Sequence, residues 1–212
     1  MYKCLICDLD NTLYSSASGM LTAIDRRIDN FMAERLFIDQ PQIRGLRSEF
    51  SHKYGTTLTG LMLHYQINPD DYFRYAYQIK IADFIRPDPA LAKVLQEINL
   101  RKAVFSNSPL EYIEEVLQIL NVRRFFDEIY DIRFCNFFGK PNPSSYQRVL
   151  AHFQVKSEEC LMVDDCPANL AQARKLGMTP ILLSPDPAPE YEWVIEEICE
   201  LKMLLPEILK RF

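Results

Sequence analysis

The sequence lacks an excess of positive charge. Its 212 residues contain 24 Lys and Arg against 29 Asp and Glu, which gives a formal net charge of −5 at pH 7. Proteins that bind nucleic acid polymers gather Lys and Arg to neutralise the phosphates. The composition therefore excludes a nucleic acid polymer as the expected partner.

The sequence also lacks a long hydrophobic run near its start. The first apolar run, residues 4–7, is short and lies between Lys3 and Asp8. A signal peptide needs about 7 to 15 apolar residues, and a membrane-spanning helix needs about 20. We therefore expect a cytoplasmic protein with no membrane partner, and we expect a monomer or a homodimer.

Residue pairs that would bind zinc or form disulfides are missing as well. Cys4 and Cys7 spell C-x-x-C, but their odd separation on a strand would direct them to opposite faces. Cys160 also lies in an apolar, strand-like run. We expect buried free thiols, as in a reducing compartment. The 3 histidines lie on predicted helices outside every motif and receive no role.

Short apolar runs alternate with amphipathic stretches along most of the chain. This alternation predicts an α/β fold, with a Rossmann-like parallel sheet and helices on both faces. The hydrophobic content of 48% is enough for one core and a small second domain. The predicted strands cover residues 4–7, 102–105, 128–131, 160–163 and 179–183, and one or two amphipathic helices are expected after Glu190.

One block of the chain interrupts the alternation. Between residues 21 and 84 apolar residues recur at helical spacing and no strand is evident. We therefore predict an α/β core made of residues 1–15 and 85–212, with an inserted all-helical domain at 16–84. Helices are expected over about 21–36, 43–54, 58–65 and 69–79, with Tyr54, Thr57, Leu61 and Tyr77 as candidates for a pocket wall.

Polar residues follow three of the predicted strands. Asp8 and Asp10 follow the first, Ser106 follows the second, and the pair 164–165 follows the fourth, while Lys140 lies in a loop. Ligands of open parallel sheets bind beyond the carboxyl ends of the strands. Taken singly, these residues could belong to turns, helix caps or the surface. Their joint placement predicts one site.

These residues form motifs with a known order. The segments DLDNT at 8–12, FSN at 105–107, GKP at 139–141 and VDDCPAN at 163–169 resemble the four motifs of the haloacid dehalogenase superfamily. The inserted helical block lies where that superfamily has its cap. The longer segments DLDNTLY, YGTTLTGL at 54–61 and RPDP at 86–89 resemble the pyrimidine 5′-nucleotidase subgroup.

The resemblance implies roles for the acidic residues. Asp8 would be the nucleophile that forms an aspartyl-phosphate, and Asp10 would be the general acid and base. Mg²⁺ would be bound by Asp8, by the main-chain carbonyl of Asp10 and by Asp165. Asp164 would position the metal ligands without contacting the metal, although either acid of the 164–165 pair could be the direct ligand.

The resemblance also implies a binding site for the phosphate. Ser106 would offer its hydroxyl and Lys140 its ammonium group to the phosphoryl oxygens. The main-chain amides of Leu9 and Asn107 would complete the set. Asn169 would orient the acidic pair or the lysine.

Together these features predict a magnesium-dependent phosphomonoesterase that acts on a small phosphorylated molecule. The subgroup resemblance favours pyrimidine nucleoside monophosphates, but Tyr77-Gln78 stands where that subgroup has His-Asp. The alternatives are a phosphatase of a sugar phosphate or another small metabolite, a phosphomutase, a dehalogenase and a non-catalytic regulatory protein. Dehalogenation needs neither a metal nor a protonated leaving group, so Asp10 and the 164–165 pair disfavour it.

Overall fold

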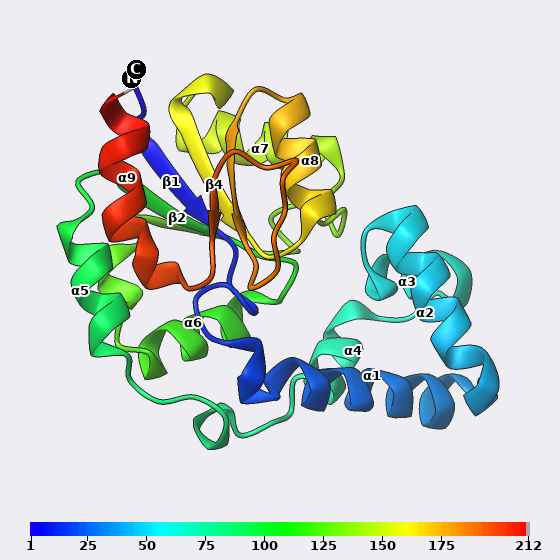
Figure 1. Ribbon diagram of the computed structural model, residues 1–212. Helices are drawn as coiled ribbons and strands as arrows, with labels where there is room; N and C mark the ends of the chain where they lie inside the picture. The colour runs from blue at the N-terminus through cyan, green and yellow to red at the C-terminus, as the bar shows by residue number, and fades with distance from the viewer. Residues whose placement is uncertain (211–212) are drawn as a thin grey trace.

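A computed structural model describes residues 1–210 (Figure 1). Its centre is a six-stranded sheet with the strand order β3-β2-β1-β4-β5-β6, in which every neighbouring pair is parallel. The predicted parallel α/β fold is therefore confirmed. The strands are β1 (Cys4–Cys7), β2 (Arg101–Phe105), β3 (Glu128–Tyr130), β4 (Cys160–Asp164), β5 (Thr179–Leu183) and β6 (Val194–Ile195).

The central strands are apolar throughout because both of their faces are covered by helices. Leu5 and Cys7 of β1 belong to one hydrophobic core, whereas Cys4 and Ile6 belong to the other. The first core includes α5 (Pro89–Glu97), α6 (Leu110–Ile119) and α9 (Leu201–Lys210), and the second includes α7 (Pro143–Phe153) and α8 (Pro167–Lys175). Figure 1 shows these two groups of helices on opposite sides of the sheet.

The cysteines agree with the prediction from the sequence. Cys4 and Cys7 lie in different cores, and all 6 cysteines are free thiols. The Cys4 Sγ contacts the Cys160 Sγ at 3.0 Å because the two residues are register partners on β1 and β4.

The C-terminal segment corrects one prediction. Only helices were expected after Glu190, but β6 adds a sixth strand to the edge of the sheet before α9 begins. The amides of Leu182 and Ser184 on the β5 side donate to the carbonyls of Trp193 and Ile195 at 3.0 and 2.8 Å. A two-residue strand is too short to show periodicity, so its partner strand determines it.

Four helices form a separate layer beyond the carboxyl ends of the strands (Figure 1). They are α1 (Met20–Leu36), α2 (Gln40–Tyr54), α3 (Thr57–Tyr65) and α4 (Pro69–Ala76). The buried face of α1 has helical spacing, with Ile24, Ile28 and Phe31 among its buried residues. The Phe31 ring packs edge-on against Tyr72 of α4 with a centroid distance of 5.4 Å. The predicted inserted helical region is therefore present.

This helical layer contacts the core at several points. The Tyr77 hydroxyl donates to the Ser108 Oγ at 3.3 Å, and the Thr59 hydroxyl donates to the Phe137 carbonyl. Arg133 pairs with Asp70 at 2.9 Å. These contacts hold the helices over the end of the sheet. Within residues 1–210, no helix has the length and apolar character needed to cross a membrane.

The buried β1 strand makes a test of the fold. Ile6→Ala should lower the free energy of unfolding by about 2 to 5 kcal/mol, because truncation leaves a cavity in a packed core. Ile6 is 1% exposed, whereas Met203 on α9 is 75% exposed. Met203→Ala should therefore change stability by less than about 0.5 kcal/mol. Urea denaturation measures both, and equal losses would contradict the position of β1 at the centre of the sheet.

Candidate active site

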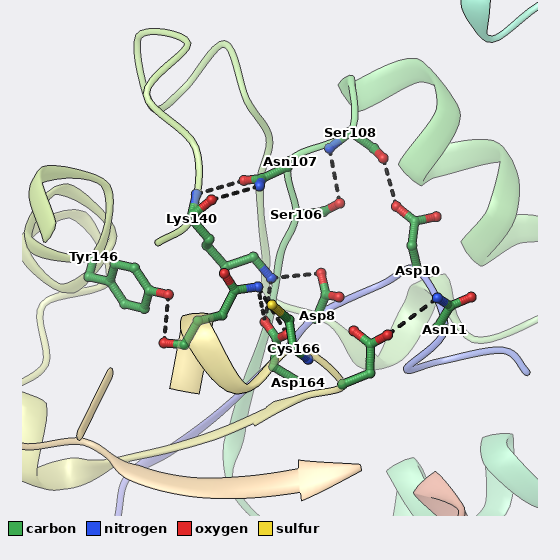
Figure 2. Close-up of polar contacts among 12 residues, drawn as sticks. Asp8, Asp10, Asn11, Ser106, Asn107, Ser108, Lys140, Tyr146, Asp164 and Cys166 are labelled. Atoms are coloured by element: carbon green, nitrogen blue, oxygen red, sulfur yellow. Dashed lines mark hydrogen bonds and ion pairs between the residues drawn. The ribbon is translucent and has the colours of Figure 1, made fainter. Parts of the chain in front are cut away.

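The candidate site lies where three neighbouring strands end. β2 and β4 pair with β1 on its two sides, so the residues after these strands meet at one edge. Asp8 follows β1, Ser106 follows β2, and Asp164 ends β4. The chain crosses from one side of β1 to the other at this point, which is the usual position of a ligand crevice in such sheets. Figure 2 shows the side chains that converge there.

Lys140 lies at the centre of the site. Its side chain is buried, and its Nζ is 2.7 Å from the Asp8 Oδ1 and 2.7 Å from the Asp164 Oδ2. Burial alone would lower the pKa of Lys140, but the charges of Asp164 and Asp8 raise it above its ordinary value. The ammonium group therefore remains charged and joins two strands through charge-assisted hydrogen bonds.

The side chain of Asn107 fixes the loop that carries Lys140. Its Oδ1 accepts from the Lys140 amide at 2.7 Å, and its Nδ2 donates to the Lys140 carbonyl at 3.0 Å. Gly139 permits this approach, because a Cβ there would clash with the Asn107 side chain. The sequence pointed to the main-chain amide of Asn107 and missed this side-chain role, whose partner lies 33 residues away.

Three carboxylates form an acidic cluster beside the lysine. One oxygen from each of Asp8, Asp164 and Asp165 lies within 4.8 Å of the others. Burial raises the pKa of Asp8 and Asp165, and the charge of Asp164 adds to this effect, while Lys140 opposes it. One ammonium group does not compensate three carboxylates. Oxygen ligands at this spacing suit a hard divalent cation, so the cluster is able to bind a metal.

The two acids that follow β4 have different surroundings. Asp164 is fully buried and accepts from Lys140, from the Cys166 amide at 2.8 Å, and from the Asn169 Nδ2 at 3.0 and 3.1 Å. Asp165 is partly exposed and accepts from the Asn11 Nδ2 at 3.3 Å. Asp164 therefore accepts more hydrogen bonds from protein groups than Asp165 does.

The carboxylate of Asp10 lies outside the acidic cluster. Its Oδ1 accepts from the hydroxyls of Tyr14 at 2.5 Å and Tyr112 at 2.8 Å, and its Oδ2 accepts from the Ser108 Oγ at 2.7 Å. Burial, together with the charge of Asp10, raises the pKa of both tyrosines, so their hydroxyls keep the protons that they donate. The sequence did not indicate these partners, since Ser108 and Tyr112 lie 98 and 102 residues from Asp10.

The residues predicted to bind phosphate lie at the same edge. Ser106 is 1% exposed, and its Oγ accepts from the Ser108 amide at 3.1 Å. Leu9 is buried between Asp8 and Asp10. The roles of the Leu9 and Asn107 amides in binding phosphate, and of the Asp10 carbonyl in binding a metal, stay predictions.

A cavity of about 370 Å³ separates the strand ends from the helical layer. Thr57 and Tyr77 line it, as the sequence analysis proposed. Tyr54 and Leu61 instead pack among the helices, because Leu61 is fully buried and the Tyr54 hydroxyl bonds the His64 ring at 2.8 Å. The helical wall consists of Leu21, Ile24, Asp25, Ile28, Ser51, Gly55, Thr56, Thr57, Leu58, Tyr72, Phe73 and Tyr77.

Comparison with known families agrees with this geometry. The sequence profile of the haloacid dehalogenase-like hydrolases matches residues 2–177 of the chain. The chain therefore belongs to this family of hydrolases. The predicted superfamily and the predicted enzyme class, a hydrolase, are confirmed.

Three curated relatives have similar sequences. Phosphate metabolism protein 8 of Saccharomyces cerevisiae is 25% identical over 198 residues, which cover 83% of this chain and 60% of that protein. Glyceraldehyde 3-phosphate phosphatase of Pyrococcus abyssi is 26% identical, covering 84% of this chain and 79% of the relative. Phosphoglycolate phosphatase of Aquifex aeolicus is 25% identical, covering 82% of this chain and 81% of the relative. The chain thus spans 60% of the yeast protein, and none of these names specifies a pyrimidine 5′-nucleotidase.

Solved structures share the fold over almost the whole chain. L-2-haloacid dehalogenase of Xanthobacter autotrophicus has a TM-score of 0.62 at 14% identity, covering 97% of this chain and 99% of that one. A hydrolase of the same superfamily from Bacillus subtilis, solved with bound magnesium, has a TM-score of 0.61 at 18% identity, covering 96% and 98%. At such identity the likeness establishes the fold alone.

The acidic cluster predicts a measurable response to magnesium. Adding Mg²⁺ should raise the thermal midpoint of the wild-type protein, because a cation that binds only the native state adds about 2.7 kcal/mol at 100 times its Kd. Asp165→Asn should remove most of this shift. Asp186→Asn, at an exposed acid outside the site, should keep it. Differential scanning calorimetry measures the shifts, and an unchanged shift in Asp165→Asn would contradict a cation site at this cluster.

Proposed function

We propose that the protein is a magnesium-dependent phosphomonoesterase that works through an aspartyl-phosphate. The observation that carries the proposal is the Asp8 carboxylate, which is held 2.7 Å from the Lys140 Nζ at the edge of an acidic cluster. A nucleophile, a fixed positive charge and a cation site are the groups that phosphoryl transfer requires. Two of the three curated relatives described above are named as phosphatases.

The chemistry divides between two aspartates. Lys140 occupies the Asp8 Oδ1, so the Oδ2 is the oxygen available to attack phosphorus. As the new O–P bond forms, the bond to the leaving oxygen breaks, and Asp10, which enters this step as the neutral acid, gives that oxygen its proton. Asp10 then removes a proton from the water that attacks the aspartyl-phosphate, which releases phosphate and restores Asp8. The tyrosine and serine hydroxyls hold Asp10 in place between these steps.

Magnesium fits the donor set of the site. Asp8, Asp165 and the main-chain carbonyl of Asp10 would hold it, since Asp164 is already occupied by Lys140 and Asn169. When bound, the cation would neutralise the charge that gathers on the phosphoryl oxygens. Asp164 and Asn169 would then support the ligands without contacting the metal.

The phosphoryl group would be bound by residues of the core alone. The Ser106 hydroxyl, the Lys140 ammonium and the amides of Leu9 and Asn107 are its proposed partners. The helical layer would act as a cap that excludes water and contacts the leaving group. On this proposal residues 1–15 and 85–212 form the catalytic core and residues 16–84 form the cap.

The substrate that we propose is a small phosphorylated metabolite. The relatives' names support this class better than a pyrimidine nucleotide, because they refer to glyceraldehyde 3-phosphate and phosphoglycolate. The segment DLDNTLY at 8–14 is the reason to include UMP and CMP in a substrate panel. A dehalogenase is disfavoured, because Asp10 and the 164–165 pair would have no part in its chemistry.

The nucleophile is tested by Asp8→Asn, which keeps the size of the side chain and removes the attacking carboxylate. Phosphate release from p-nitrophenyl phosphate should fall by at least about a thousandfold, or roughly 4 kcal/mol of barrier. Asp186→Asn, measured in parallel with magnesium and with a chelator, controls for a general charge effect. If Asp8→Asn retains more than about a tenth of the activity, which is only about 1.4 kcal/mol, then Asp8 is not the nucleophile.

A further inference from the structure

The charges around the cavity are almost all negative. Asp8, Asp10, Asp25 and Asp165 line it, and among residues 1–210 Lys140 is the only cationic side chain that does so. Lys140 lies on the core wall and already pairs with two carboxylates. Once a phosphoryl group occupies that wall, no described lysine or arginine of the cavity remains for a second anion.

The helical layer has a cation close to the cavity, but its charge is compensated. Arg47 of α2 forms ion pairs with the Asp25 carboxylate and, at 2.7 Å, with the Asp29 carboxylate. It also donates to the Asp25 carbonyl at 3.1 Å. Asp25 lines the cavity, whereas Asp29 and Arg47 do not. Asp25 is therefore the member of this ion-paired group that borders the cavity.

The remaining helical wall combines apolar and hydroxyl groups. Leu21, Ile24 and Leu58 supply the apolar surface, and Thr56 and Thr57 supply hydroxyls. An uncharged organic group with hydroxyl substituents can be buried here without losing a charge partner. A carboxylate placed here would lie beside Asp25, whose partner Arg47 is already shared with Asp29, so it would meet a net negative group and find no cation of its own.

We propose that the enzyme selects phosphate esters whose only negative charge is on the phosphoryl group, with Asp25 as a specificity-determining residue. The inference rests on the proposed function and narrows it to neutral, hydroxylated leaving groups. It also distinguishes between the substrates in the names of the two phosphatase relatives. The leaving group of glyceraldehyde 3-phosphate is uncharged, whereas the leaving group of phosphoglycolate carries a carboxylate. Esters that carry a carboxylate or a second phosphate would be excluded.

Matched pairs of substrates test the proposal on the intact enzyme. 2-Hydroxyethyl phosphate and 2-phosphoglycolate share a two-carbon skeleton and differ in a CH2OH group against a carboxylate. Glycerol 3-phosphate and 3-phosphoglycerate share a three-carbon skeleton and differ in the same way. In each pair kcat/KM should be at least about tenfold higher for the hydroxyl member. Added salt should narrow the difference, because ionic strength screens repulsion between charges that are not in contact.

Two variants locate the cause of the selectivity. Asp25→Asn removes the acid that borders the cavity. Within each pair, the ratio of kcat/KM for the hydroxyl member to that for the carboxylate member should fall by about threefold or more. Asp29→Asn also removes a partner of Arg47, but it changes no residue of the cavity and should leave the ratio within about twofold of wild type. The hydroxyl member of each pair, measured in the same variant, corrects for changes in overall activity or folding.

The possible results separate this inference from the proposed function. Equal or better turnover of the carboxylate member, with p-nitrophenyl phosphate still hydrolysed, would overturn the inference and leave the phosphatase intact. An equal effect of Asp29→Asn and Asp25→Asn would remove Asp25 from its assigned role. No phosphate release from any ester, with magnesium present, would overturn the proposed function together with the inference.

Discussion

The ion pairs of Lys140 with Asp8 and Asp164 are the interactions on which the site depends. They join the end of β1, the end of β4 and the loop before α7 through two contacts of 2.7 Å in a buried setting. Loss of the ammonium group would leave buried carboxylates without a compensating charge. The free energy lost in this way is larger than the net stabilisation that the intact ion pair provides. Contacts other than these ion pairs hold the backbone of this loop. The Asn107 side chain bonds to it, and the absence of a side chain at Gly139 permits that approach.

The same electrostatics separate the two acids that the proposed chemistry needs. Asp8 lies among like charges and one ammonium group, where a cation and a phosphoryl group would both be accommodated. Asp10, two residues away, turns from this cluster to the hydroxyls of Tyr14, Tyr112 and Ser108. Hydroxyl groups hold a carboxylate without adding charge. One short segment after β1 can thus present two carboxyl groups in two different environments.

The helical layer and the core form two walls of one cavity that differ in chemical character. On the proposed function, the strand ends would supply a fixed set of charges for one phosphoryl group, which is common to all phosphate esters. The helices supply the opposite wall of the cavity, with apolar, hydroxyl and acidic groups. On the proposed function, selection among substrates would depend on residues that differ in kind from those of the core wall, and a change of substrate would not require a change in the chemistry.

The sequence by itself determined the central strands, the four helices of the inserted region and the residues that meet at the strand ends. These features are local, because hydrophobic periodicity and the polar residue after each strand are visible within a few positions. Tertiary structure alone decided the β6 strand, the Asn107–Lys140 contact, the pairing of Asp10 with Ser108 and Tyr112, and the charge of the cavity wall. Each of these depends on groups brought together from distant parts of the chain, 33 residues apart for Asn107 and Lys140 and 102 for Asp10 and Tyr112. No local pattern specifies which distant hydroxyl, amide or acid will face a given side chain, since packing of the whole sheet and its helices sets that choice.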